Sequence, residues 1–467
     1  MLILVGFFVV ATSLVYWSTL NSDSMLARDD NPRRVETERA LLRGTIYDRA
    51  GRALAQTLIV GTSPSGQPVV RRDYPFASAS SAVGYYSLVH GVGGVESAFD
   101  KQLRGDDLRD AGQVQVDALL HRPQIGSDVR LTLDIQLQTA ISAALLGRRG
   151  AVIAIDVPSG AVLAMVSVPT FDPNTLDQAY DELLKDPAAP LLNRVTQGLY
   201  QPGGALETVI LAAMLTDKAD LNAPVSGAAT PLQINGVTLK CAAQTTASLA
   251  LKDAYSLACP SPFAEYTVAH PANVQNMLGS FGLFAAPSLA NFQTISGPAI
   301  APLSQTQDAA QLRAEGAGQG KLTVTPLQMA LAAATVANNG NAISPYLVDA
   351  TRAPGAKDWT ALDMPHTQKA VVTQDVANGI TTAMRDAVAS GAGNAADRPD
   401  VAGLLVHGHA STAYTGPNQQ QIAWFIGYAM LPNGHAIAVT VTVEDADARV
   451  AAQVGGATLA QAAQIVR

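Results

Sequence analysis

Two pairs of strand-like apolar segments, far apart in the sequence, constrain the fold of this chain more than any other feature. Each pair brackets a turn, the second at residues 432–434, and each predicts a β-hairpin of buried strands. Between the pairs, from about residue 200 to 390, the chain is rich in alanine and favours helices. Strands at both ends of a helical region imply a sheet whose terminal segments meet, which is an α+β fold. The two pairs are residues 150–156 with 161–166, and residues 423–428 with 436–443.

Shorter patterns add detail to this plan. Residues 128–133 alternate in polarity, which predicts a strand. Asp134 follows and is placed to cap a helix that contains Leu137. Upstream, in the segment that begins at residue 44, residues 48–51 predict a turn between two strand-like pieces, and residues 94–103 have a helical period.

The chain begins with an apolar run long enough to cross a membrane. Residues 1–22 carry no charged side chain, and as a helix residues 2–20 would extend roughly 28 Å, close to the hydrocarbon thickness of a bilayer. A cleaved signal peptide is the alternative, although no Ala-x-Ala site follows. We therefore predict a single-pass anchor in the lipid bilayer at residues 1–22, a stalk and small domain at residues 23–125, and a large body at residues 126–467.

Composition excludes several classes of function. The 38 acidic and 30 basic residues give a net charge of -8, so no nucleic-acid partner is expected. With 48% hydrophobic and 15% charged residues, the chain is not disordered. Its two cysteines, Cys241 and Cys259, are too few for a four-thiolate zinc site, but they could form a disulfide if the body lies outside the cytoplasm.

Several segments together resemble the class B penicillin-binding proteins, the membrane-anchored D,D-transpeptidases that cross-link peptidoglycan. Their order and spacing carry the resemblance, since each segment alone is weak. The resemblance implies a penicillin-binding transpeptidase domain like that of the serine β-lactamases, a central antiparallel sheet with helices, preceded by a small β-rich domain. The segments are RGTIYDRAG at 43–51, LTLD at 131–134, residues 150–169, FDPN at 171–174, GQG at 318–320, TPLQMA at 325–330, ANNG at 337–340 and WFIG at 424–427.

The three catalytic motifs of that family are absent. Such enzymes carry Ser-x-x-Lys, Ser-x-Asn and Lys-Thr-Gly, in which a serine hydroxyl one helical turn from a lysine acts as the nucleophile. No Ser-x-x-Lys, Ser-x-Asn or Lys-Thr-Gly occurs anywhere in the chain, so a shift of alignment cannot restore them. The residues at the motif positions are Gly204 and Glu207, then Ala258 and Pro260, then His409, Ala410 and Ser411.

The remaining polar residues allow other chemistry. Glu207 and His409 replace the two lysines and would face each other across the cleft. There they could act as an acid and a base, or they could be the result of neutral drift after the loss of catalysis. His407 shares a strand face with His409, but a third ligand is missing, so we predict no metal and no cofactor. Trp424 fits a hydrophobic core better than a cleft wall. Three serines could replace the nucleophile but lack a lysine partner: Ser256, Ser261 and Ser411.

From these observations we predict a catalytically inactive homologue, a pseudoenzyme with no catalytic residue. It would be a structural or regulatory subunit of a cell-envelope complex with protein partners, in the cell membrane with its body outside the cytoplasm. One alternative is a reversible binder of peptidoglycan stem peptides or β-lactams. A second is the transpeptidase function in peptidoglycan synthesis that the family implies, or new hydrolytic chemistry on Glu207 and His409.

Overall fold

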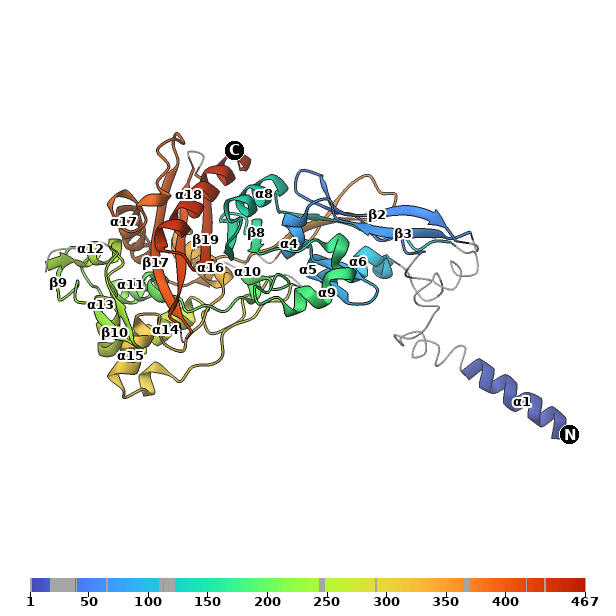
Figure 1. Ribbon diagram of the computed structural model, residues 1–467, viewed down its shortest axis with the longest axis horizontal. Helices are drawn as coiled ribbons and strands as arrows, with labels where there is room; N and C mark the ends of the chain where they lie inside the picture. The colour runs from blue at the N-terminus through green and yellow to red at the C-terminus, as the bar shows by residue number, and fades with distance from the viewer. Residues whose placement is uncertain are drawn as a thin grey trace.

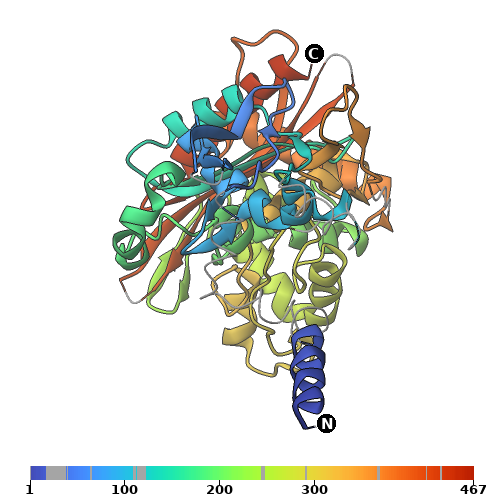
Figure 2. The same cartoon turned by 90° about the vertical axis from the view of Figure 1, so that its right-hand side faces the viewer.

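The computed structural model describes most of the chain, in two parts: a body and a smaller N-terminal region beside it (Figure 1). Seen along the long axis, the N-terminal strands lie in front of the body (Figure 2). The residues described are 2–16, 38, 40–63, 66–108, 112, 122–242, 248–289, 292–364, 369–416, 418–431 and 434–466.

A five-stranded antiparallel sheet forms the centre of the body, in the order β17-β18-β19-β7-β8. β19 pairs with β7 from Ile437 opposite Asp156 to Glu444 opposite Arg149. This pairing confirms that the two distant hairpins meet in one sheet; Pro432 and Asn433 of the second turn lie outside the described residues. The strands are β7 (Arg149–Asp156), β8 (Val162–Val168), β17 (Leu405–Thr415), β18 (Gln420–Met430) and β19 (Ala436–Glu444).

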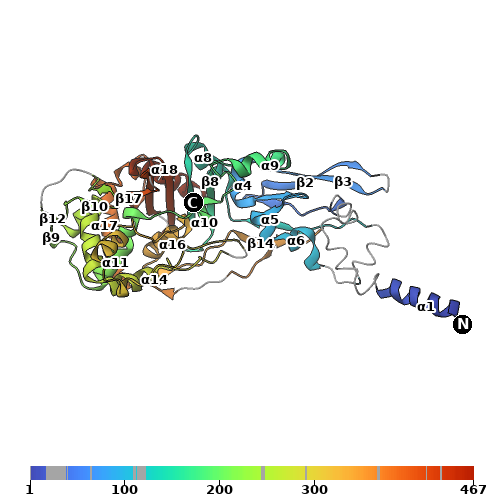
Figure 3. The same cartoon turned by 60° about the horizontal axis from the view of Figure 1, so that its bottom comes forward.

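Helices cover both faces of this sheet (Figure 3). α8 (Ile135–Ala144) and α18 (Ala448–Ile465) pack on one face, and α16 (Pro326–Ala337) packs on the other, with α11 (Glu207–Thr216) and α17 (Gln374–Ser390) in the same hydrophobic core. The other elements of the body are α9 (Leu176–Lys185), α10 (Arg194–Gln197), α12 (Leu251–Ser256), α13 (Pro260–Ala269), α14 (Pro271–Ser280), α15 (Ala309–Gly316), β9 (Pro224–Ser226), β10 (Leu232–Ile234), β11 (Val237–Leu239), β12 (Ser248–Ala250), β13 (Asn341–Ala342), β16 (Lys369–Ala370), η4 (Pro173–Thr175), η5 (Gly203–Leu206), η6 (Leu303–Gln305) and η7 (Asn394–Ala396).

Capping residues explain where two of these helices begin. The Asp134 carboxylate accepts hydrogen bonds from the backbone N–H groups of Gln136 and Leu137, which confirms the predicted cap of α8. α16 begins after Thr325, whose hydroxyl accepts from the N–H of Gln328 while the Gln328 side chain accepts from the Thr325 N–H.

A six-stranded sheet organises the N-terminal region, in the order β15-β14-β6-β1-β2-β3. Three of its strands, β6, β14 and β15, come from residues 128–131 and 348–361, so the sheet crosses the predicted boundary between residues 125 and 126. The predicted turn at residues 48–51 joins β1 to β2, and the predicted helix at residues 94–103 is two short helices. The elements are β1 (Ile46–Tyr47), β2 (Ala53–Thr62), β3 (Pro68–Asp73), β6 (Asp128–Leu131), β14 (Val348–Arg352), β15 (Thr360–Ala361), β4 (Tyr85–Ser87), β5 (Gly91–Gly93), α4 (Ser80–Val83), α5 (Gly94–Ala98), α6 (Asp100–Arg104), η2 (Ala77–Ala79) and η3 (Asp106–Leu108).

A buried ion-pair network stabilises this region. The fully buried Glu96 carboxylate accepts from Arg43 Nε at 2.6 Å and from Arg72 Nε at 2.7 Å. Burial alone would raise the pKa of Glu96, but the charges of Arg72 and Arg43 outweigh it and lower that pKa. Segment 43–51 therefore contributes Arg43 to a buried charge cluster in the N-terminal region.

α1 (Leu2–Val15) stands apart from the folded parts (Figure 1). It covers 14 residues of the predicted anchor; residues 17–22 and most of the predicted stalk lie outside the described part of the chain. Among the described residues, no helix has both the length and the apolar character needed to span a membrane.

Candidate functional site

One wall of a cleft in the body is the short turn η5 and the start of α11. Gly203 has a φ of +51°, and a Cβ built on it would lie 2.6 Å from the Thr412 carbonyl oxygen, so only glycine fits. The Gln201 carbonyl accepts a hydrogen bond from Trp424 Nε1 at 3.0 Å, which holds the turn against β18. The indole itself is fully buried, so Trp424 is a core residue, as the sequence indicated.

β17 forms the facing wall. His409, Ala410 and Ser411 follow one another on this strand, with Ser411 opposite Trp424 of β18. Side chains alternate between the faces of a strand, so His409 and Ser411 face α11 whereas Ala410 packs into the core on the α18 side.

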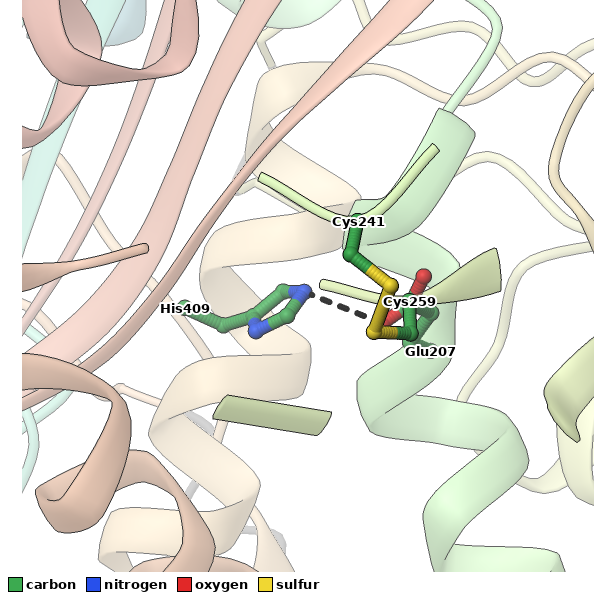
Figure 4. Close-up of a disulfide and its surroundings, with 4 residues drawn as sticks. All are labelled: Glu207, Cys241, Cys259 and His409. Carbon is green, nitrogen blue, oxygen red and sulfur yellow. Dashed lines mark ion pairs between the residues drawn. A yellow bond between two sulfur atoms is a disulfide. The ribbon is translucent and has the colours of Figure 1, made fainter. Parts of the chain in front are cut away.

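The third wall carries a disulfide. Cys259 lies at the N-terminus of α13 and is bonded to Cys241 with an S–S distance of 2.10 Å, the pairing that the sequence left open (Figure 4). The bond anchors the segment after β11 beside Ala258 and Pro260. Ala258 has a φ of +48°, a left-handed conformation that side chains other than glycine and asparagine rarely adopt.

These walls enclose a cavity of about 330 Å³. It brings together most of the positions that the sequence singled out, although they come from three distant parts of the chain. The cavity also borders Lys240 and Thr238, which sequence reasoning missed; only the neighbouring cysteine could have signalled Lys240. The residues around it include Gly204, Glu207, Thr238, Lys240, Cys241, Ala258, Pro260 and Ser411.

Glu207 and His409 meet across the cleft, as predicted (Figure 4). Glu207 Oε2 lies 3.4 Å from His409 Nε2, and both side chains are buried. Their geometry does not make a hydrogen bond, because both of these atoms and His409 Nδ1 are without a hydrogen-bond partner. Burial raises the pKa of Glu207, and His409 offsets only part of that rise. The Tyr255 ring stacks on His409 with centroids 4.3 Å apart and fixes the imidazole.

Other candidates lie away from the cavity. His407 stacks on Tyr428 with ring centroids 4.8 Å apart, and burial lowers its pKa. Among the described residues, no group of three His, Cys, Asp or Glu side chains could hold a metal ion. Ser256, at the end of α12, and Ser261, in α13, are both buried and do not border the cavity.

Comparison with known proteins identifies the fold and the family. Residues 150–467 match the family described as "Penicillin binding protein transpeptidase domain". The chain is 30% identical over 476 residues to the peptidoglycan D,D-transpeptidase PbpA of Mycolicibacterium smegmatis, covering 94% of this chain and 93% of that protein. It is 29% identical to PbpA of Mycobacterium tuberculosis, over 94% of this chain and 91% of that protein.

Solved structures of penicillin-binding proteins have the same fold as this chain. The crystal structure of PBPA from Mycobacterium tuberculosis has a TM-score of 0.79 and 27% identity, covering 90% of this chain and 99% of that chain. The imipenem acyl-enzyme complex of penicillin-binding protein A from M. tuberculosis has a TM-score of 0.78 and 27% identity, covering 91% of this chain and 100% of that chain.

These findings correct one prediction. The absence of the three motifs predicted a chain without enzymatic activity, but the matching relatives are named peptidoglycan D,D-transpeptidases, which are enzymes. A motif search tests only for fixed residue types at fixed spacings within one segment, and it does not detect groups that reach the cleft from a facing strand. With a family match over residues 150–467 and 30% identity to PbpA over nearly its full length, the chain belongs to the class B penicillin-binding proteins.

Proposed function

We propose that the protein acts in peptidoglycan synthesis as a D,D-transpeptidase, which transfers the acyl group of a D-alanyl-D-alanine stem peptide to an amine. One observation carries the proposal: the three motif positions converge on one cavity, with Gly204 and Glu207 on α11 and its approach, Ala258 and Pro260 at α13, and Ser411 on β17. The cavity has room for the end of a peptide, and its polar groups come from several elements, as in other ligand sites.

Lys240 supports a carboxylate-terminated substrate. It is exposed and borders the cavity, whereas the family's cleft lysines are replaced by Glu207 and His409. A lysine at the rim attracts the terminal carboxylate of a stem peptide by charge. Lys240→Ala should raise KM for a stem peptide several-fold with little effect on kcat, whereas Lys185→Ala, on the distant helix α9, should change neither.

We place the body outside the cytoplasm, anchored through residues 1–22 in the lipid bilayer and associated with other envelope proteins. The disulfide supports this placement, because such bonds persist in oxidising compartments. Thiol alkylation of native membranes should label neither cysteine until a reductant is added; labelling without reductant contradicts the placement. Cross-linking in the same membranes, followed by pull-down, should retain specific envelope proteins.

The activity is tested with the purified full chain in detergent and a pentapeptide stem ending in D-Ala-D-Ala. We expect time-dependent release of D-alanine, exchange of an added D-amino acid into the peptide, and inhibition of both by excess penicillin G. Binding of the peptide without release or exchange would reduce the protein to a reversible binder and contradict the proposal. Release without exchange, at any concentration of acceptor amine, would indicate a hydrolase.

A further inference from the structure

We propose that Ser411 Oγ is the acyl-accepting nucleophile of the cleft, delivered from β17 to the place that a side chain at Gly204 would fill, with Glu207 as its base. This inference rests on the proposed function. It assigns the reaction to a residue on the opposite wall from the family's usual serine.

The first argument is the position of the hydroxyl. A Cβ built on Gly204 would lie 2.7 Å from Ser411 Cβ and 3.2 Å from Ser411 Oγ. Cβ atoms in real structures do not come that close, so a side chain at position 204 and the present Ser411 exclude each other. The hydroxyl of Ser411 therefore occupies the region where the motif spacing expects the serine.

The second argument is the lack of internal partners. Ser411 Oγ, Glu207 Oε2 and both ring nitrogens of His409 are buried and form no hydrogen bond within the protein. Buried polar atoms are nearly always hydrogen-bonded, because desolvating them without a partner is costly. Glu207 Oε2 and His409 Nε2 at least face each other as an ion pair, whereas Ser411 Oγ borders the cavity and has no hydrogen-bond partner in the protein, which indicates that a bound molecule supplies one.

The third argument is the base. Glu207 Oε1 lies 3.2 Å from the same Cβ point at Gly204, so it is at most twice that distance from Ser411 Oγ. A change of the Ser411 rotamer or one bridging water closes this gap, and catalytic contacts are commonly longer in unliganded enzymes. Burial raises the pKa of Glu207, which makes its carboxylate a better proton acceptor than an exposed one.

The chemical step balances within these groups and the substrate. Ser411 Oγ attacks the carbonyl carbon of the D-Ala-D-Ala peptide bond, or of a β-lactam amide. A C–O bond forms, the C–N bond breaks, and the hydroxyl proton passes to the Glu207 carboxylate and then to the leaving nitrogen. His409, held by Tyr255, lies beside Glu207 and stabilises its charge in the ionised state. The acceptor amine then attacks the ester carbonyl: a C–N bond forms, the C–O bond to Ser411 breaks, and the amine proton passes through Glu207 back to Ser411 Oγ.

The experiment incubates the full chain with penicillin G and follows intact mass, then locates the adduct by peptide mapping. We expect one adduct, on the peptide that contains Ser411. Ser411→Ala should slow acylation on the order of 10⁴-fold or more, and Glu207→Gln by about 10²–10⁴-fold. Ser256→Ala, which also removes a buried unpartnered hydroxyl but not one at the cavity, should be acylated at the wild-type rate.

Two further measurements keep a failure interpretable. Ser411→Cys retains a nucleophile of similar size and should form a thioester adduct, so loss in Ser411→Ala with retention in Ser411→Cys is not a folding defect. An adduct on another residue, or Ser411→Ala acylated at the wild-type rate, would overturn the inference. If wild type and Ser411→Ala release D-alanine from the stem peptide equally fast, the inference fails and the proposed function stands. If the wild type releases none, the proposed function fails as well.

Discussion

The close approach of Gly204 and Ser411 predicts that the two positions depend on each other. Restoring a serine at position 204 places its Cβ 2.7 Å from Ser411 Cβ, about 1 Å inside ordinary carbon–carbon contact. Overpacking of this kind costs about 1–3 kcal/mol. We therefore expect Gly204→Ser to lower the free energy of unfolding by that amount.

Removing the obstructing side chain should reverse the effect. Ser411→Gly alone should cost about 0.5–1 kcal/mol, because glycine weakens a strand interior. In the double variant the new serine has room, so its stability should match that of Ser411→Gly alone. The coupling energy between the two substitutions should then be about 1–3 kcal/mol in favour of the double variant.

Urea unfolding in one detergent measures the free energy of unfolding of the wild type, the two single variants and the double variant. The dependence of that free energy on urea concentration must be the same for all four proteins. Gly204→Ser combined with Ala410→Gly is the matched control, because Ala410 packs on the other face of β17. Additivity within about 0.5 kcal/mol for the Gly204–Ser411 pair would refute the reasoning, since it would show that the two side-chain positions do not compete for space.

Three further predictions concern the surroundings of the site and the N-terminal region. Ala258→Gly should raise the free energy of unfolding by about 0.5–1 kcal/mol, because φ is +48° there; a loss measured by urea unfolding would contradict the strain. Replacing Cys241 and Cys259 together by alanine opens a loop with a sequence separation of 18 and should cost about 3 kcal/mol in the same assay, whereas an unchanged midpoint would mean that the reduced chain is already constrained. Arg43→Met should cost about 3–5 kcal/mol near neutral pH. The lowered pKa of Glu96 gives the wild type stability that is lost as pH falls, so the difference in stability between wild type and Arg43→Met should shrink in acid. If the thermal unfolding midpoints of the two proteins differ by the same amount at every pH, the charge argument is contradicted.

The sheet of the body could be predicted from sequence because its strands are buried on both faces and read as continuous apolar runs. The cap at Asp134 could be predicted because a cap is local. The six-stranded sheet could not: β14 and β15 are short, and nothing in their sequence indicates that they return to pair beside β6. The pairing of Cys241 with Cys259 could be suggested from sequence only because the chain has no other cysteine.

The site shows the same division. Glu207 and His409 could be placed opposite each other once the family resemblance fixed their elements. The contact between Ser411 and Gly204 could not be seen, because it depends on side-chain directions across two elements rather than on spacing within one. Reading the motifs alone led to the prediction of an inactive chain, which the relatives named as D,D-transpeptidases contradict.

The pairing of β7 with β19 also determines when the body can fold. Residues 149–156 must wait for residues 437–444, so the centre of the sheet cannot close until nearly the whole chain has been synthesised. Contacts between such distant residues slow folding and leave apolar strands exposed in the meantime. If the body crosses the membrane during export, β7 and β8 reach the far side long before β19, the partner of β7. Its folding would then depend on whatever shields those strands until the last hairpin arrives.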